Sequence, residues 1–210
     1  MAQLYFRYSS MNAGKSIDIL KIANNYEEQG KRVILFTHKI DTRYGVGKIR
    51  SRVGLERAGI PIDDTMDVAV EVRKNLPLSC VLVDEGQFLT REQVLQFCKV
   101  VDDDNIPVIV YGLRADFQNR LFPGSEALLV FADKIEEVKT VCWFCNRKAL
   151  MNLRVADGKP VREGEQVLIG GNESYLPVCR RHFYADELPW DPTNVKRPPE
   201  SVPSPSLFKP

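Results

Sequence analysis

The sequence has almost no charge imbalance and no long apolar run, and each absence excludes a class of protein. Its 210 residues include 29 lysines and arginines against 28 aspartates and glutamates, a formal net charge of +1. Proteins that bind duplex nucleic acid usually carry a clear basic excess. The longest apolar run, Ala127 to Ala132, is far shorter than the roughly 20 residues that cross a membrane. We therefore expect neither a nucleic-acid partner nor a membrane.

A secretory signal and a disulfide framework are also missing. The N-terminal residues Met1-Ala2-Gln3-Leu4 contain no basic segment followed by an apolar one, so we expect a cytoplasmic protein. The chain is long enough to bury a core without cross-links. Its five cysteines are odd in number, and we expect them to stay reduced. Cys80 and Cys98 lie in apolar stretches and are expected to be small buried hydrophobes.

Residues 1–140 alternate between short apolar segments and amphipathic ones. This alternation predicts an α/β fold with a parallel sheet covered by helices on both faces, and ligands at the carboxyl ends of the strands. The predicted strands are Gln3–Tyr8, Arg32–Thr37, Cys80–Val83 and Pro107–Tyr111. The predicted helices are Lys15–Gln29, Asp67–Lys74 and a segment from the capping box at Thr90 to Val101.

The pattern changes after Thr140. Ala149–Val155, an Asp157-Gly158 turn and Gln166–Ile169 predict a β-hairpin. Seven of the chain's 13 prolines fall in residues 189–210, which predicts a tail without helix or central strand. We therefore predict a nucleotide-binding domain at 1–140, a small metal-binding domain at 141–188 and a proline-rich tail at 189–210.

A phosphate-binding loop follows the first predicted strand. Residues 9–16, SSMNAGKS, match the P-loop fingerprint G-x-x-x-x-G-K-[ST] at all but the first position. Gly14 lets the backbone wrap phosphates, Lys15 reaches their charge, and the Ser16 hydroxyl is a ligand for Mg²⁺. Ser9 stands where glycine is expected, and it would be strained if that position needs a positive φ. The alternative is a chance match in a strand–helix turn.

Two adjacent acids follow another predicted strand. Val81-Leu82-Val83 is apolar and leads into Asp84, which fits the carboxylate that holds Mg²⁺ in P-loop proteins. Because side chains alternate along a strand, we expect Glu85 to point elsewhere and to be available as a general base. The alternative is a strand that ends in solvated acids.

Two cysteine-containing pairs have the spacing of metal ligands. Cys142 and Cys145 form C-x₂-C, and Cys179 and His182 form C-x₂-H. Three thiolates and an imidazole make a closed tetrahedral Zn²⁺ site, which predicts a structural role for the metal. The alternative is buried free cysteines with a surface histidine.

Together these motifs resemble the type II thymidine kinases, the tetrameric cytosolic family. The resemblance covers about Ala2 to Tyr184. It rests on the ordered set of the phosphate loop, DEGQF at 84–88, YGLRADFQ at 111–118, the two cysteine pairs and GGNESY at 170–175. Ser9 departs from the commonest family loop, and His182 stands where many members have a fourth cysteine. The implied fold is a P-loop, RecA-like α/β domain with a small zinc-binding lasso domain.

The resemblance implies transfer of the γ-phosphate of ATP to the 5′-hydroxyl of thymidine. Glu85 would accept the proton from that hydroxyl. The implied ATP and Mg²⁺ residues are Ser9, Ser10, Met11, Asn12, Ala13, Gly14, Lys15, Ser16, Asp41, Arg43, Asp84 and Gln87, with Arg52 in the same region. Asp41 and Arg43 would lie on a mobile loop over the phosphates. Two interpretations of Arg114 stay open: it belongs to the site, or it only forms an ion pair with Asp116.

The resemblance also implies a nucleoside pocket, whose residues are Met11, Leu113, Phe117, Gln166, Val167, Leu168, Ile169, Gly170 and Tyr175. The 166–171 loop would bind the base through backbone groups, and the zinc cluster would anchor that loop. A homotetramer and inhibition by thymidine triphosphate are implied on the same basis. From the residues alone, aromatic packing is the favoured explanation of Phe117 and Tyr175, and only the resemblance favours a binding role. The glycines of Tyr44–Lys48 fit an ordinary surface loop and a lid hinge equally well.

Two other functions fit parts of the pattern. A P-loop ATPase that acts on nucleic acid would use the Cys/His cluster as a contact, but the balanced charge argues against it. A nucleotide-binding regulator without catalysis is a third possibility, and it is weakened by the presence of both Lys15 and Glu85.

Overall fold

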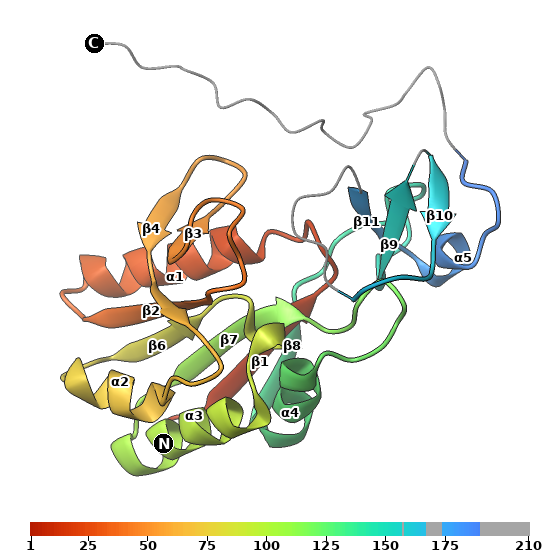
Figure 1. Cartoon of the computed structure of the whole chain (residues 1–210). Coiled ribbons are helices and arrows are strands. Elements are labelled where there is room, and N and C mark those ends of the chain that lie inside the picture. Colours follow the sequence, from red (N-terminus) through yellow and green to blue (C-terminus); the bar gives the residue numbers. More distant parts are fainter. Residues whose placement is uncertain (157, 167–173, 190–210) are drawn as a thin grey trace, which may run out of the picture.

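A parallel sheet forms the centre of the computed structural model, which describes residues 1–156, 158–166 and 174–189. Its strands, in spatial order, are β5 (Ile60–Ile62), β2 (Val33–His38), β6 (Cys80–Val83), β7 (Val108–Leu113), β1 (Leu4–Ser9) and β8 (Lys134–Glu137). Every neighbouring pair is parallel. The predicted α/β fold with a parallel sheet is therefore confirmed (Figure 1).

Helices cover both faces of this sheet (Figure 1). One face carries α1 (Lys15–Glu28), which buries Ile19, Leu20 and Ala23 against Leu35 and Leu82 of the sheet. The other face carries α2 (Val68–Lys74), α3 (Arg91–Asp104) and α4 (Pro123–Phe131) over a larger apolar cluster. These two layers bury the alternate side chains of the same strands, which is why the central strands β6 and β7 are almost entirely apolar.

The helix boundaries follow local chemistry. The predicted capping box of α3 is present, because Thr90 Oγ1 accepts from the Gln93 N–H while the Gln93 side chain accepts from the Thr90 N–H. Asp67 caps α2 in the same way through the Val70 N–H. The sequence pattern did not predict α4 or β8. The apolar run of α4 has no helical period, and β8 is a mostly exposed edge strand.

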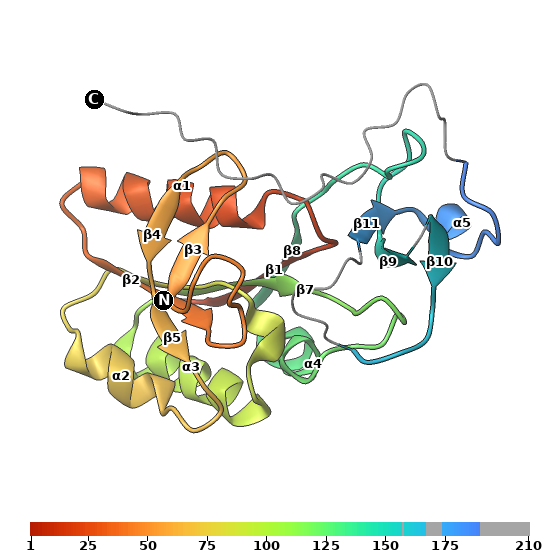
Figure 2. The same ribbon diagram turned by 45° about the horizontal axis from the view of Figure 1, so that its top comes forward.

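The chain segment that connects β2 to β5 forms a short hairpin, which lies outside the main sheet (Figure 2). It consists of β3 (Lys48–Arg50) and β4 (Glu56–Ala58), which pair in antiparallel fashion. The glycine-rich segment before it takes a left-handed backbone at Gly45 and Gly47, with φ of 99° and 75°. A side chain at Gly47 would also lie 2.9 Å from the carbonyl oxygen of Gly59. Glycine is therefore required at Gly47 by the close approach of two chain segments.

The C-terminal part has a core of its own. The strands β9 (Met151–Ala156), β10 (Lys159–Val161) and β11 (Ser174–Val178) form an antiparallel sheet in the order β10-β9-β11, and α5 (Arg180–Phe183) follows. Leu153, Leu176 and Phe183 are among the residues buried there. This sheet lies beside the carboxyl end of β7 (Figure 1).

The sequence pattern predicts that Gln166–Ile169 pairs with β9 as a hairpin. This prediction is wrong at Gln166, which lies in a bend and not in a strand. Gly158 has a φ of 77°, and the strand beside β9 begins directly after it at Lys159. Pro160 is tolerated because β10 is an edge strand. Residues 167–169 of the predicted strand and the proline-rich tail from 190 onward lie outside the described residues. Within the described ranges, no helix is long and apolar enough to cross a membrane.

The helix α4 packs unusually closely on the short 3₁₀ turn η1 (Gly86–Phe88), which follows β6 and the two adjacent acids. A Cβ atom at Gly124 would lie 2.4 Å from the carbonyl oxygen of Gly86, 2.7 Å from that of Leu89 and 2.9 Å from that of Gln87. Backbone oxygens cannot rotate away as a side chain can. Gly124 therefore determines how close α4 comes to this turn.

We predict that Gly124→Ala lowers the free energy of unfolding by about 1–3 kcal/mol or more, because the added methyl group must separate α4 from η1. Denaturant unfolding measures this change. Val130→Ala on the exposed side of α4 is the matched control and should stay within about 0.5 kcal/mol of the unmodified protein. An unchanged stability of Gly124→Ala would contradict this account of the packing.

Candidate active site

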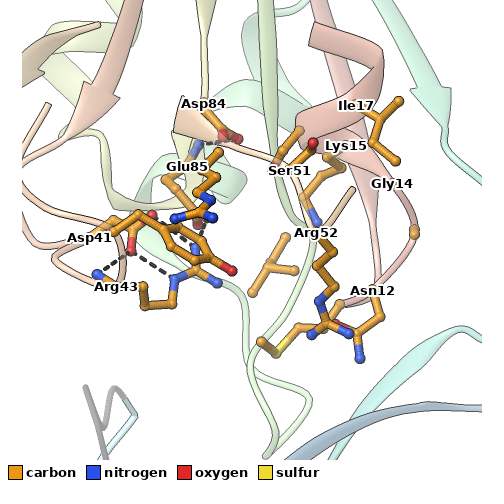
Figure 3. Close-up of a pocket in the computed structure, with 16 residues that line it drawn as sticks. Asn12, Gly14, Lys15, Ile17, Asp41, Arg43, Ser51, Arg52, Asp84 and Glu85 are labelled. Carbon is orange, nitrogen blue, oxygen red and sulfur yellow. Dashed lines mark hydrogen bonds and ion pairs between the residues drawn. The ribbon is translucent and has the colours of Figure 1, made fainter. Parts of the chain in front are cut away.

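The carboxyl ends of several strands meet at one edge of the sheet and surround a cavity (Figure 3). Five segments contribute to it: the loop after β1, the segment after β2, the end of β3 with the turn that follows it, the acids after β6 and the end of β7. The residues that line it are Met11, Asn12, Ala13, Gly14, Lys15, Ser16, Ile17, Asp41, Arg43, Tyr44, Arg50, Ser51, Arg52, Asp84, Glu85 and Leu113. Most of the predicted ATP and Mg²⁺ residues are therefore brought together.

The phosphate loop has the backbone turns that its sequence requires. Asn12 and Gly14 both have a left-handed backbone, with φ of 61° and 84°. The Gly14 carbonyl accepts from the N–H groups of Ile17 and Asp18 and so begins α1. Ser9 is the last residue of β1, and its φ is not positive. The strain predicted for serine at this position is therefore absent, because the loop makes its left-handed turns further along the chain.

The ammonium group of Lys15 lies inside the loop. Its Nζ donates to Ser9 Oγ at 2.9 Å and to the Ser10 carbonyl at 3.4 Å, while Ser9 Oγ donates to the same carbonyl at 2.6 Å. Burial lowers the pKa of Lys15, and the nearby carboxylates of Glu85 and Asp84 oppose that shift. A buried ammonium at the opening of a helix is suited to binding a phosphate chain.

The two acids leave the strand differently from the prediction. The strand β6 ends at Val83, so simple alternation does not decide where Glu85 points. Glu85 has a left-handed backbone with φ of 56°, and its N–H donates to Asp84 Oδ1 at 3.0 Å. The direction of the Glu85 side chain is therefore set by this turn and not by strand alternation. The strain of a non-glycine residue in this conformation is often found at functional sites.

Asp84 is buried, and its carboxyl is unusually basic. Burial and the charge of Glu85 raise the pKa of Asp84 to about 7, although Lys15 and Arg43 act in the opposite direction. A divalent cation beside this carboxylate would favour its ionised form. The donor set of a buried carboxylate and the Ser16 hydroxyl therefore fits a hard cation such as Mg²⁺.

Both oxygens of Glu85 are engaged by neighbours. Oε1 accepts from Arg43, which also forms a two-point ion pair with Asp41 at 2.7 and 2.9 Å (Figure 3). Oε2 accepts from the side-chain amide of Gln87 at 2.5 Å. Gln87 in turn accepts from the Leu113 N–H at 3.0 Å, and only 1% of its surface is exposed.

Gln87 therefore differs from the other residues predicted to bind ATP. Its side chain is not among those that line the cavity. It orients Glu85 through one hydrogen bond and connects it to the end of β7 through another. A Cβ atom at Gly112 would lie 3.0 Å from both the backbone nitrogen and the side-chain amide oxygen of Gln87, so a larger residue there would crowd Gln87.

The two aromatic residues predicted for the nucleoside pocket are in contact with each other. The rings of Phe117 and Tyr175 meet edge to face with centroids 6.3 Å apart. Arg154, from β9, places its guanidinium 4.7 Å from the Phe117 ring centroid and 5.9 Å from that of Tyr175. Gln166 donates to Asp116 Oδ2 at 2.9 Å, which ties the loop after β10 to the segment after β7. Val167, Leu168, Ile169 and Gly170 lie outside the described residues.

Arg114 does not form the predicted alternative pair with Asp116. It donates instead to the Leu150 carbonyl at 3.3 Å, and its guanidinium lies 5.6 Å from the Tyr8 ring centroid. Asp116 accepts from the N–H groups of Gln118 and Arg120, as well as from Gln166. Arg114 therefore contributes to the contact between the two sheets.

The predicted zinc ligands converge. The sulfur atoms of Cys142, Cys145 and Cys179 and the His182 ring offer ligand atoms that all lie within 4.8 Å of one another. Cys145 Sγ and Cys179 Sγ are 3.8 Å apart, and His182 Nδ1 lies 3.3 Å from Cys142 Sγ and 3.5 Å from Cys179 Sγ. Tetrahedral coordination with Zn–S bonds of about 2.3 Å requires sulfur atoms about 3.7 Å apart. The residues fit a structural zinc ion.

Some buried polar residues at the site were missed by sequence reasoning. Asn152 and Arg154 on β9 are 4% and 2% exposed. Asn152 contacts the segments that follow β1 and β7, and Arg154 contacts the segment that follows β7. Their alternation with Leu153 and Val155 was visible in the sequence. It is ambiguous there because alternation normally marks a solvent-exposed strand face.

The fold and the site define a P-loop α/β phosphotransferase with an attached Cys₃His metal site. The family model described as "Thymidine kinase" matches residues 2–183. The thymidine kinase of Lactococcus lactis is 56% identical over 190 residues, which cover 90% of this chain and 100% of the relative. That of Enterococcus faecalis is 55% identical over 186 residues, 88% of this chain and 95% of the relative. The chain belongs to the thymidine kinase family, whose members phosphorylate thymidine with ATP.

We predict that Cys142→Ser lowers the zinc content from one ion per chain to almost none. The melting temperature should fall by roughly 5–15 °C, because a bound ion would join the turn segment before β9 to α5 and its binding energy would stabilise the fold. Native mass spectrometry and thermal unfolding measure the two effects. Cys98→Ser is the matched control, since Cys98 lies on α3 outside the cluster. A metal-free protein with an unchanged melting temperature would contradict a structural zinc site.

Proposed function

We propose that phosphoryl transfer takes place in the cavity at the carboxyl ends of β1 and β6. The observation that carries this proposal is the meeting of Lys15, Asp84 and Glu85 in one cavity, where a phosphate-binding cation, a metal-binding acid and a base lie together. The phosphate chain of ATP would bind in the loop of residues 9–16. Lys15 would leave its contacts with Ser9 and Ser10 and take up the negative charge of the phosphates.

The proposed base is Glu85. The 5′-oxygen of thymidine forms a bond to the γ-phosphorus, the bond from that phosphorus to the β,γ-bridging oxygen breaks, and ADP leaves. The proton of the 5′-hydroxyl passes to the Glu85 carboxylate. Gln87 holds this carboxylate by its Oε2, so that Oε1 can face the hydroxyl once Arg43 has moved.

Arg43 has two proposed roles. Without substrate it neutralises Glu85 and Asp41. With ATP bound, the greater charge of the phosphates would attract Arg43 away from Glu85, while Asp41 keeps its guanidinium near the cavity. Arg52 lines the same cavity from the β3–β4 connection and would add a second cation (Figure 3). Binding of ATP and release of the base would then be linked.

Asp84 and the Ser16 hydroxyl are the proposed Mg²⁺ ligands. The ion would neutralise phosphate charge as ATP binds. The nucleoside would lie between the end of β7 and the C-terminal sheet, with Met11 and Leu113 on one side and Phe117 and Tyr175 on the other. Phe117 would stack on the base, and backbone groups of the segment from Gln166 to Gly170 would read its edge.

The other proposals concern organisation and regulation. We propose a nucleotide-binding domain at 1–140, a zinc-binding lasso domain at 141–188 and a tail at 189–210, since the second part has its own apolar cluster. The family relationship supports a homotetramer and inhibition by thymidine triphosphate, which presents both a thymine and a phosphate chain. ATP is an intracellular substrate, and we place the enzyme in the cytoplasm.

Incubation with ATP, Mg²⁺ and each of the four deoxynucleosides tests the proposed activity through the monophosphate formed. We expect thymidine monophosphate, and its loss in Lys15→Ala. Hydrolysis of ATP without a nucleoside product, stimulated by nucleic acid, would instead support the P-loop ATPase.

We predict that Glu85→Gln lowers kcat by about 10²–10⁴-fold, because an amide cannot accept the proton. Its affinity for ATP should stay close to that of the unmodified enzyme, as measured by calorimetry. Glu92→Gln, an exposed acid on α3, is the control and should leave kcat unchanged. A Glu85→Gln variant with normal turnover would remove Glu85 from the role of base.

A further inference from the structure

The side chain of Asn152 joins the two parts of the active site. It comes from β9 in the C-terminal sheet and is only 4% exposed. Its Oδ1 accepts from the backbone N–H of Met11 at 2.7 Å, and its Nδ2 donates to the carbonyl of Ala115 at 2.8 Å. One buried amide thus connects the phosphate loop after β1, the segment after β7 and the zinc-binding part of the chain.

Asn152 and Lys15 bind the same peptide group, the one between Ser10 and Met11. The Met11 N–H and the Ser10 carbonyl belong to the same planar unit. Ser9 Oγ donates to that carbonyl at 2.6 Å, and Lys15 Nζ donates to it at 3.4 Å. The orientation of this one peptide plane is therefore set from one side by the phosphate-binding lysine and from the other by Asn152.

The second hydrogen bond of Asn152, to the Ala115 carbonyl, connects it to the chain segment of the proposed nucleoside pocket. Ala115 lies two residues before Phe117, which contacts Tyr175. Asn152 is also opposite Pro177 in the pairing of β9 with β11, the strand that carries Tyr175 and leads to the zinc-ligand residue Cys179. The segment that leads to Phe117 and the loop that would hold ATP are thus both hydrogen-bonded to the same amide.

We propose that Asn152 is a positioning residue that sets the phosphate loop at a fixed distance from the nucleoside pocket. This inference rests on the proposed roles of Lys15 and Phe117. Phosphoryl transfer requires the 5′-oxygen to approach the γ-phosphorus in line, and a displacement of about 1 Å can lower the rate by about 10²-fold. Asn152 touches neither reacting atom; it acts by holding the two sites in register.

This role has a kinetic signature that differs from that of a binding residue. Each ligand alone still meets an intact site when Asn152 is replaced, because its own contacts remain. Only the alignment of the two ligands is lost. We therefore expect kcat to fall while the separate affinities for thymidine and for a non-hydrolysable ATP analogue are kept.

The test compares Asn152→Leu and Asn152→Asp with the unmodified zinc-loaded enzyme. Leucine has a similar shape and loses both hydrogen bonds, whereas aspartate can still accept from the Met11 N–H but cannot donate to Ala115 when it is ionised. We expect kcat to fall by about 10–100-fold in Asn152→Leu and by less in Asn152→Asp. The two dissociation constants should change by less than about threefold. Asn24→Leu, on the exposed surface of α1, is the control.

Zinc content and melting temperature are measured for every variant, so that a folding defect is recognised. Normal kcat in Asn152→Leu would overturn the proposal. So would unchanged kcat with weaker binding of either ligand, or loss of zinc and stability in both variants, since the residue would then be a binding or a purely structural one. Absence of thymidine phosphorylation in the unmodified enzyme would instead contradict the proposed function itself.

Discussion

The parallel register of β1, β7 and β6 is the constraint on which the site depends. Ser9 at the end of β1 lies opposite Leu113 of β7, and Val83 at the end of β6 lies opposite Val110 of the same strand. Parallel strands end at the same edge of a sheet, so the phosphate loop and the two acids must open into one space. Closely packed apolar side chains on both faces keep this register, because a slip by one residue would exchange the two cores.

The charges gathered at this edge balance each other in the free protein. Lys15 lies in the field of Asp84 and Glu85, and Arg43 bridges Asp41 and Glu85. Buried charges are costly unless they are paired, and here each cation has a carboxylate near it. ATP and Mg²⁺ bring charges of both signs and would exchange these partners. The site is thus kept stable while empty by the same residues that we propose for catalysis.

Much of this site could be predicted from the sequence, because its chemistry is local. The segment of residues 9–16, the acids after Val83 and the Cys/His pairs each carry a spacing that only a few structures satisfy. What could not be predicted depends on tertiary contacts. The left-handed backbone of Glu85, the support of Gln87 from behind and the bridge through Asn152 arise only when β7 and β9 are placed in space. Ser9 shows the reverse case, in which a motif mismatch suggested strain that the extended strand avoids.

The C-terminal sheet gives the zinc cluster a clear physical purpose in this account. The cluster joins the turn segment before β9 to the residues directly after β11, and these two strands carry Asn152, Arg154 and Tyr175. A metal ion that takes no part in the chemistry can therefore fix the position of side chains at the nucleoside pocket. We propose that a zinc ion bound there would shape that pocket through two strands and not through direct contact.

The most direct measurement is a crystal structure of the enzyme with Mg²⁺, a non-hydrolysable ATP analogue and thymidine. We predict that the Glu85 carboxylate lies within hydrogen-bond distance of the 5′-hydroxyl, still held by Gln87, with Arg43 moved from Glu85 to the phosphates. A nucleoside bound away from Glu85, or Arg43 still paired with Glu85 in that complex, would contradict it.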